Sequence, residues 1–318
     1  MTNEQSIRVV AISWLSIAVG AGPSSAQTET DSARDERHHQ EEASLAKASQ
    51  NPVANLVSLP LQYNFYTAGG LGPTSEMVLN VQPVLPLPIG KNWLIVSRTI
   101  VPFTSVPLSD TTKSTGIADI QEQVYFTSSR PQKFTWGAGP IFSFPTATNN
   151  FIQTGQWGLG PTAVGLVMPG PWVIGLLANN IWRIGGDARG HVLNTFTMQP
   201  FINYNLAHAW AIGTSPIITS DWSASDDERW TVPIGLGFSK ITHIGEQPVN
   251  LGLQYYHNIK HPSFAGSEQM RFVVTALWPT SEAKEREKKL AAEREAREKV
   301  ARSKEAPKQN EREKERQP

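Results

Sequence analysis

The stretch "MRFVVTALWPTSEAKEREKK", residues 270–289, combines two patterns that together indicate the fold. From Met270 to Trp278 every second side chain is apolar, while Arg271 and Thr275 lie on the alternate positions. Such period-two alternation is typical of a β-strand. Shortly after Trp278 the chain becomes almost entirely charged. A strand that ends at tryptophan, with charge following at once, is expected where a lipid-facing strand leaves the hydrocarbon of a membrane.

Charge is distributed very unevenly along the chain. The sequence has 28 basic and 28 acidic residues; 23 of them lie in 281–318, against 22 in the much longer stretch 51–280. Charged residues make up about a quarter of an ordinary soluble domain, because they normally cover the wetted surface. The scarcity of charge in 51–280 therefore indicates a surface that faces lipid. The zero net charge argues against a nucleic-acid-binding protein, which usually carries a basic surplus.

Repeated alternation across 51–280 predicts an all-β structure. Apolar residues alternate with Thr, Gly, Asn or Gln in 192–204, 229–239 and 248–257, as they do in 268–278. Each predicted strand is about ten residues long, the length that a tilted transmembrane strand needs. The predicted strands are 53–66, 76–86, 92–102, 117–127, 134–144, 157–167, 171–182, 191–205, 208–220, 229–240, 248–257 and 268–278. Short turns alternate with longer loops between them, so we predict a closed antiparallel transmembrane β-barrel of about twelve strands over 51–280.

Tryptophan positions give independent support for a barrel. Nine of the ten tryptophans lie in 51–280, and all nine fall at predicted strand ends. Indole rings favour the headgroup level of a membrane, where the apolar ring and the polar N–H are both satisfied. One predicted aromatic girdle, at the strand ends taken as periplasmic, contains Trp93, Trp136, Trp172, Trp210 and Trp278. The other contains Trp157, Trp182, Trp222 and Trp230.

The two ends of the chain differ from this central region. Residues 1–26 contain Arg8, an apolar stretch and small residues near Ala26, which is the pattern of a signal peptide. We therefore expect export and a location in the bacterial outer membrane. Residues 27–50 are polar and mixed in charge, which predicts a flexible lead-in. In 281–318, Glu often precedes Lys or Arg by four positions, which predicts a charged periplasmic tail that is helical or disordered.

Polar residues on the predicted inward faces indicate an aqueous lumen. Arg98 is assigned to the lumen because an Arg that faces lipid at that depth would cost about 2–4 kcal/mol. The predicted lumen-lining residues are Arg98, Asp119, Gln121, Gln123, Thr195, Thr197, Gln199, Asn203, Gln254 and Arg271. The alternative is a closed barrel whose interior is packed with polar side chains and allows no flow.

Some residues conflict with simple alternation. Glu122 shares the predicted outward face of Ile120, Val124 and Phe126, so we expect either a bulge that resets the phase or a position near a rim. Proline removes a donor from the hydrogen-bond ladder, and we expect bulges or rim positions to accommodate some of the prolines inside predicted strands. These are Pro83, Pro140, Pro161, Pro200, Pro216 and Pro233.

Motifs for catalysis or cofactor binding are absent. Gly137 with Gly139, and Gly158 with Gly160, precede proline inside strands, which favours close packing over a nucleotide site. We expect no catalytic residues, no cofactor and no metal site. A barrel hydrolase would need a rim histidine near a serine, for which His257, His261 and Ser263 are the best candidates.

Several segments resemble one protein family. They include "WGAGPIFSFPTAT" (136–148), "WGLGPTAVGL" (157–166), "LNVQPVLPLPIGKNWLIVSRTIVP" (79–102) and "QPFINYN" (199–205). They are similar to the outer-membrane barrel proteins related to the meta-pathway phenol-degradation proteins, whose bacterial members are often mislabelled as neuromedin U. The resemblance implies an outer-membrane channel or transporter and carries over no binding residues. Members commonly end at or just after the last strand, whereas a charged tail follows it here.

These observations lead to one expected function and two alternatives. We expect a passive channel for small molecules; only the resemblance indicates a hydrophobic or aromatic class. The first alternative is a structural or adhesive barrel that tethers the envelope through its tail, and the second is the barrel hydrolase. The expected partners are outer-membrane lipid and lipopolysaccharide, a small-molecule solute and the barrel-assembly machinery. The tail could contact a periplasmic protein or peptidoglycan, and no nucleic acid is expected.

Overall fold

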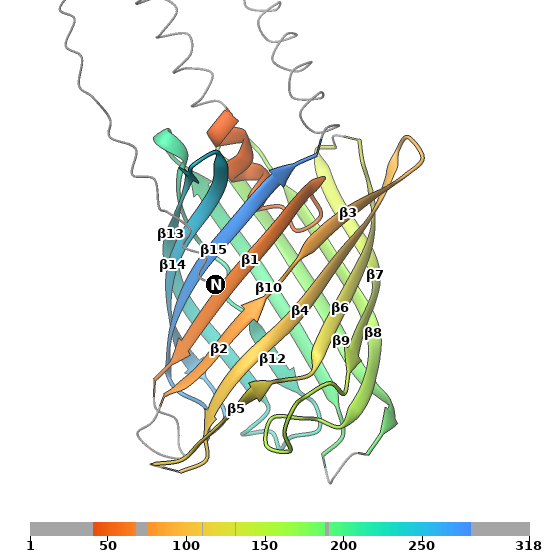
Figure 1. Cartoon of the computed structure of the whole chain (residues 1–318), viewed down its shortest axis with the longest axis vertical. Coiled ribbons are helices and arrows are strands. Elements are labelled where there is room, and N and C mark those ends of the chain that lie inside the picture. Colours follow the sequence, from red (N-terminus) through yellow and green to blue (C-terminus); the bar gives the residue numbers. More distant parts are fainter. Residues whose placement is uncertain (1–40, 68–74, 110, 131, 188–190, 281–318) are drawn as a thin grey trace, which may run out of the picture. The chain divides into compact units, whose positions relative to one another are not determined.

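The computed structural model describes residues 41–67, 75–109, 111–130, 132–187 and 191–280. The predicted signal peptide, most of the predicted lead-in and the charged tail lie outside the described residues. The described chain is almost entirely antiparallel sheet (Figure 1). Its helical parts are residues 41–49 and the short 3₁₀ turn η1 (Ala207–Ala209). Neither is long and apolar enough to cross a membrane.

Fifteen β-segments form the sheet. They are β1 (Leu56–Tyr66), β2 (Glu76–Val81), β3 (Val84–Ile89), β4 (Trp93–Pro107), β5 (Lys113–Ile117), β6 (Ile120–Ser128), β7 (Phe134–Phe144), β8 (Gln156–Val167), β9 (Trp172–Gly186), β10 (Asn194–Asn205), β11 (Trp210–Thr214), β12 (Ile218–Asp221), β13 (Trp230–Ile244), β14 (Gln247–Lys260) and β15 (Glu268–Pro279). Three strands of the barrel are each interrupted by a short gap. The segments β2 and β3 form one such strand, β5 and β6 form the second, and β11 and β12 form the third. The sheet therefore has twelve strands, as predicted.

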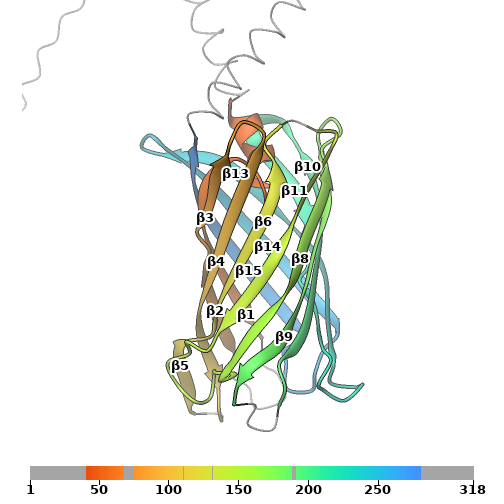
Figure 2. The ribbon, with the colours of Figure 1, turned by 90° about the vertical axis from the view of Figure 1, so that its right-hand side faces the viewer.

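The sheet closes on itself. Each strand pairs with its sequence neighbours, and β1 pairs with β15 from Leu56↔Pro279 to Tyr66↔Gln269. Figure 2 shows β4, β6 and β8 among the tilted strands on another side of the same barrel. Closure matters because it pairs the backbone of every strand on both sides and leaves no exposed sheet edge. This confirms the predicted closed antiparallel barrel.

The barrel has two unlike ends. We call the end where β1 begins and β15 ends the terminal end; short turns join β3 to β4, β8 to β9 and β13 to β14 there. At the opposite end, the loop end, longer connections join β1 to β2, β7 to β8 and β14 to β15. This difference matches the alternation of short and long connections in the sequence.

Prolines mark several irregularities of the strands. Pro83 lies in the gap between β2 and β3, and Pro216 lies in the gap between β11 and β12. The pairing of β13 with β14 shifts register between Val232 and Pro233. Pro140 and Pro161 instead face each other within the continuous pairing of β7 with β8. Interruptions and one bulge thus absorb some of the missing proline donors, as expected.

Alternate side chains point into and out of the barrel. Along β8 the pattern is regular: Thr162, Val164 and Leu166 are buried, whereas Leu159 and Val167 are exposed. A buried apolar cluster fills one side of the interior, and it consists of Val53, Leu94, Val96, Tyr125, Val164, Leu166, Val173, Leu177 and Phe201. The outer face is apolar although exposed, and includes Leu176, Ile202, Ile212, Leu236, Phe238, Phe272 and Val274. Such a large exposed apolar surface indicates contact with a nonaqueous environment.

Residues 41–55 occupy the terminal end of the barrel. Residues 41–49 form a helix in a region whose composition predicted a flexible lead-in. Buried Ala46 packs in a second cluster with Leu56, Ala209, Ile241 and Leu277, and Val53 joins the main apolar cluster. We call residues 41–54 the N-terminal plug. Small alanines let it fit between the strands although its overall composition is polar.

Of the two positions expected for Glu122, the structure excludes a bulge. The pairing of β6 with β7 runs without a register shift from Ile120↔Phe144 to Thr127↔Gly137, so no bulge resets the phase. Glu122 stays on the outer face with exposed Phe126, and it is the third residue of β6 from the loop end, opposite Phe142, in keeping with a position near that rim. Its carboxylate accepts hydrogen bonds from Ser97 Oγ at 2.6 Å and Thr99 Oγ1 at 2.5 Å, both on β4. These two hydroxyls explain how the carboxyl group is accommodated there.

Candidate functional site

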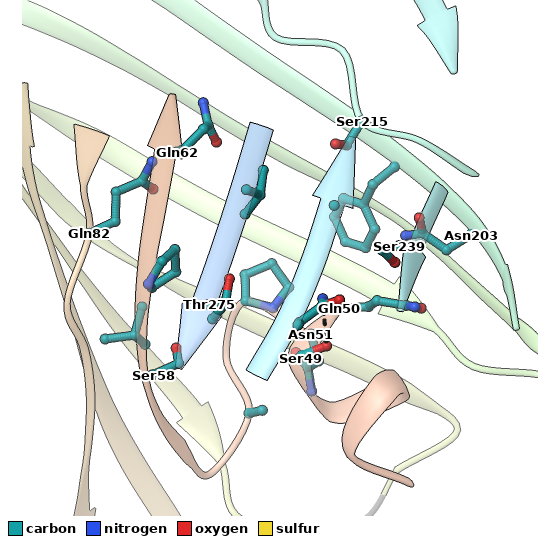
Figure 3. Close-up of a pocket in the computed structure, with 18 of the residues that line it drawn as sticks. Ser49, Gln50, Asn51, Ser58, Gln62, Gln82, Asn203, Ser215, Ser239 and Thr275 are labelled. Atoms are coloured by element: carbon teal, nitrogen blue, oxygen red, sulfur yellow. Dashed lines mark hydrogen bonds between the residues drawn. The ribbon is translucent and has the colours of Figure 1, made fainter. Parts of the chain in front are cut away.

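A cavity of about 220 Å³ lies inside the barrel. The N-terminal plug forms one wall through Ser49, Gln50 and Asn51, and side chains from β1, β10 and β13–β15 form others. Figure 3 shows Ser58 and Gln62 of β1 and Thr275 of β15 around the same space, with the end of the plug helix beside them. The cavity extends to two arginines, Arg98 and Arg271.

Hydrogen bonds hold the plug against the barrel wall. The side chains of Gln50 and Asn205 exchange two hydrogen bonds, at 3.0 and 3.2 Å. Asn250 Nδ2 donates to Ser49 Oγ at 3.3 Å, and Lys47 Nζ donates to the carbonyl oxygen of Gly170 at 2.5 Å. These contacts are side-chain bonds to three different strands or turns. They can break without disturbing the ladder that closes the barrel.

Arg271 is the centre of a buried polar network. Its side chain is 1% exposed. Nε donates to Asn64 Oδ1 at 3.1 Å, and Nη1 donates to Gln254 Oε1 at 3.0 Å and to the carbonyl oxygen of Ser215 at 2.9 Å. The guanidinium carbon lies 4.8 Å from the centre of the Tyr256 ring, a cation–π distance. Every one of these partners is neutral.

Arg98 reaches the same cavity from β4. Its Nη2 donates to Gln82 Oε1 at 2.5 Å, and Gln82 lies in the gap between β2 and β3. The interruption of the strand thus places an amide acceptor beside the arginine. Both arginines lie on the inward face, where alternation predicted them.

Some of the ten residues that were predicted to line the lumen line the cavity, and the others do not. Five line the cavity: Arg98, Gln199, Asn203, Gln254 and Arg271. Gln123 is buried and accepts a hydrogen bond from Tyr125 at 2.7 Å. The other inward positions that do not line the cavity are Gln121, Thr195 and Thr197.

Asp119, also predicted to line the lumen, holds a loop instead. Its Oδ1 accepts from the backbone N–H of Ala147 at 3.1 Å. Its Oδ2 accepts from the N–H and the hydroxyl of Thr154, at 2.8 and 2.6 Å. Asp119 follows the end of β5, and its bonds fix the connection between β7 and β8 over the loop end. A carboxylate with this many donors is committed to that structural role.

Other residues of the site escaped the sequence reasoning. Asn64 and Tyr256 lie on inward faces, so alternation could have found them, whereas Gln82 and Ser215 lie in strand interruptions where alternation fails. The plug residues carried no signal, because nothing in their composition indicates that they line a cavity.

Seven of the nine tryptophans are exposed, and most of the nine lie at or next to a strand end, whereas Trp182 lies four residues before the end of β9. Trp93 stacks on Phe126 with ring centres 4.6 Å apart, and Trp172 meets Tyr204 at 4.8 Å, both at the terminal end. Trp222 contacts Trp230 at 5.6 Å, and Trp157 contacts Phe144 at 5.8 Å, both at the loop end. The rings of the two predicted girdles thus pack against further aromatic residues.

The residues proposed for hydrolysis have other partners. His257 Nδ1 pairs with Glu268 Oε1 at 2.7 Å, while the backbone N–H of Ser263 donates to Glu228 Oε2 at 2.6 Å. No hydrogen bond joins His257 to Ser263 within the described chain. Among the described residues, groups of three or more His, Asp or Glu side chains in a metal-binding arrangement are absent as well.

Comparison with known structures identifies the type of fold. An outer membrane channel from Pseudomonas putida F1 matches with a TM-score of 0.55, at 12% sequence identity, over 70% of this chain and 95% of that chain. The fold is that of an outer-membrane β-barrel. Outer membrane phospholipase A from Escherichia coli matches at 12% identity over 70% of this chain and 91% of its own, with a TM-score of 0.40. The translocator domain of the autotransporter NalP from Neisseria meningitidis matches at 9% identity over 80% and 98%, with a TM-score of 0.41.

Sequence comparisons add no closer relationship. No protein-family profile matches the chain, and no curated protein matches its sequence. The resemblance to the phenol-degradation family therefore stays a prediction from the sequence.

Proposed function

We propose that this protein is a channel of the bacterial outer membrane that admits small molecules by passive diffusion. The observation that carries the proposal is a cavity lined by both polar and apolar side chains, inside a barrel whose outer face is apolar. An apolar exterior suits lipid, and the amides, hydroxyls and arginines that line part of the cavity provide polar contacts that lipid does not. No catalytic group is needed, because the concentration gradient would drive the flux.

The N-terminal plug supplies a gate for this path. It lies at the terminal end, which the proposal places in the periplasm together with the short turns. Side-chain hydrogen bonds hold it, so its displacement would leave the backbone pairing of the barrel intact. A solute would enter from the loop end, reach the cavity and leave past the displaced plug.

The cavity favours a small solute with some apolar character. Leu56, Val84, Leu177 and Phe201 line it together with amides and hydroxyls. Its volume of about 220 Å³ is below the range of roughly 300–1,000 Å³ found for sites that hold drug-sized ligands. The apolar lining agrees with the hydrophobic or aromatic class that the sequence resemblance implies.

Conductance measurements test the proposal. The purified mature protein, inserted into planar lipid bilayers, is expected to produce discrete current steps. Heat-unfolded protein at the same concentration serves as the control. A folded barrel, shown by its heat-modifiable migration on gels, that produces no steps would contradict the channel. Binding to peptidoglycan that is lost on deletion of 281–318 would then favour the envelope tether.

A further inference from the structure

The cavity has an unbalanced charge. Arg98 and Arg271 line it, and no Asp or Glu is among the described residues that do so. We propose that this cavity is a binding site for small organic carboxylates, which the two arginines select. The inference names the solute class of the channel proposed above and rests on that function.

Arg271 has the properties of a ligand-binding cation. A buried charge is normally paired with an opposite charge, because removing a charge from water is costly. Arg271 instead has only the amide, carbonyl and aromatic partners described above. Its Nη2 is buried and finds no hydrogen-bond acceptor among the described residues. Arg271 lines the cavity, so a small rotation of its guanidinium group would let the unpaired Nη2 donate to a bound carboxylate.

Arg98 adds a second positive charge at the cavity. Among the described residues its side chain donates only to the neutral amide of Gln82, and no carboxylate there pairs with it. Two cations in a site with low-dielectric walls concentrate anions from solution. The network around Arg271 fixes its position without neutralising it, because Asn64 and Gln254 are themselves held by neighbouring side chains.

The acidic side chains in or beside the strands do not line the cavity. Asp119 binds the connection between β7 and β8, and Glu122 lies on the outer face. Glu268 bonds to His257 and to the hydroxyl of Tyr255. Glu76 begins β2 at the loop end and does not line the cavity. None of these four carboxylates contributes to the cavity wall, so the positive charge of the arginines stays available to a solute.

The other residues that line the cavity indicate the kind of chemical group that carries the carboxylate in the ligand. Leu56, Val84, Leu177 and Phe201 provide apolar contact, while Gln62 and Gln199 can orient a polar substituent. The matching ligand has one carboxylate and a compact apolar body. Benzoate is a suitable probe, and benzamide is its neutral counterpart of nearly the same shape.

The first measurement is binding of benzoate to the full mature protein in detergent, by titration calorimetry. We expect benzoate to bind more tightly than benzamide. Arg271→Gln should weaken benzoate binding by at least about tenfold, because hydrogen bonds to a charged group are lost. Arg271→Lys should restore part of the affinity. Arg130→Gln is the control, since Arg130 lies in an exposed turn and bonds to Asn92.

The second measurement is ion selectivity under a KCl gradient in planar bilayers. Wild type and Arg130→Gln should prefer chloride, and Arg98→Gln and Arg271→Gln should lose that preference. If Arg271→Gln fails to fold, as judged by heat-modifiable migration, the results for Arg98→Gln test the carboxylate site in both measurements.

The outcomes separate the two proposals. Equal binding of benzoate and benzamide, or binding unchanged in the arginine variants, would overturn the carboxylate site even if current steps are seen. Benzoate binding that depends on the arginines, in a protein that gives no current steps, would support the site and reject the channel.

Discussion

At the scale of single residues, Glu122 shows how an outward-facing carboxyl group can be tolerated. It lies four residues from Phe126, which stacks on the girdle residue Trp93. At roughly 3.3 Å per residue, that places it about 13 Å farther along the strand. If the protein spans the membrane as proposed, Glu122 lies between the two girdles, nearer the loop end, where Phe144 contacts Trp157 two residue pairs away. Ser97 and Thr99 then supply donors that lipid cannot provide.

Removal of both donors should destabilise the barrel. The double change Ser97→Ala and Thr99→Val leaves the Glu122 carboxylate without its two hydroxyl partners. We expect the free energy of unfolding to fall by about 3 kcal/mol, since each hydrogen bond to a charged group contributes roughly 1.5–3 kcal/mol. The measurement is urea unfolding in phospholipid vesicles, followed by tryptophan fluorescence.

Ser105→Ala provides the matched control. Ser105 is on the same strand, and its hydroxyl bonds to the hydroxyl of Thr115 at 2.9 Å in an exposed position. Its loss should change the unfolding free energy by no more than about 0.5 kcal/mol. A double variant no less stable than this control would show that the hydroxyls do not support Glu122.

Alternation predicted which way most side chains point, but not what they contact. It put Arg98 and Arg271 on inward faces and kept Glu122 outward, where the structure places them. The hydroxyls of Ser97 and Thr99 come from a different strand, so only the pairing register of β4 with β6 brings them to Glu122. Gln82 reaches Arg98 from a strand interruption, which periodicity does not describe.

At the scale of elements, the strands were predictable and the N-terminal plug was not. Each strand carries its own repeated signal, because one face meets the interior and the other faces outward. The plug has no such signal: the helix buries mainly Ala46, and Val53 lies beyond the helix. Its position depends on a cavity that exists only after twelve strands have closed.

Deletion of residues 41–52 should open the path through the barrel. The deletion removes the plug side chains that bond to Asn205, Asn250 and Gly170, and keeps Leu56 and the rest of β1. We expect larger unitary conductance in planar bilayers, with the heat-modifiable migration of a folded barrel.

Two substitutions refine this test. Gln50→Ala removes the pair of bonds to Asn205 and should make transient openings more frequent. Glu41→Ala, at the exposed start of the helix, should behave like wild type. Unchanged conductance in the deletion variant would mean that the plug does not limit the flow.

At the scale of the whole molecule, the outer face is the feature that composition predicted best. The low charge content of 51–280 corresponds to an exterior of exposed apolar side chains between two groups of aromatic residues. Composition could predict this surface because it averages over many residues. It could not predict the cavity, which depends on a few side chains from distant strands.

A charged side chain on the outer face should lower the free energy of unfolding strongly in the middle of a strand and only slightly at its end. Leu236, in the middle of β13, is 60% exposed, and Ile244, the last residue of β13, is 64% exposed. We expect Leu236→Arg to lower the unfolding free energy by about 2–4 kcal/mol and Ile244→Arg by no more than about 1 kcal/mol. Unfolding in vesicles measures both values, and equal values would contradict a membrane-embedded belt.

The pairing of β1 with β15 also determines how a damaged copy of this protein fails. A polypeptide that stops short of Pro279 loses part or all of the last strand, so the first strand keeps unpaired N–H and C=O groups. If the barrel spans a membrane as proposed, such a product should not form a stable pore, because an open edge cannot rest in hydrocarbon. Under the proposed function, a frameshift late in the coding sequence should therefore abolish transport through this protein without making the membrane leaky.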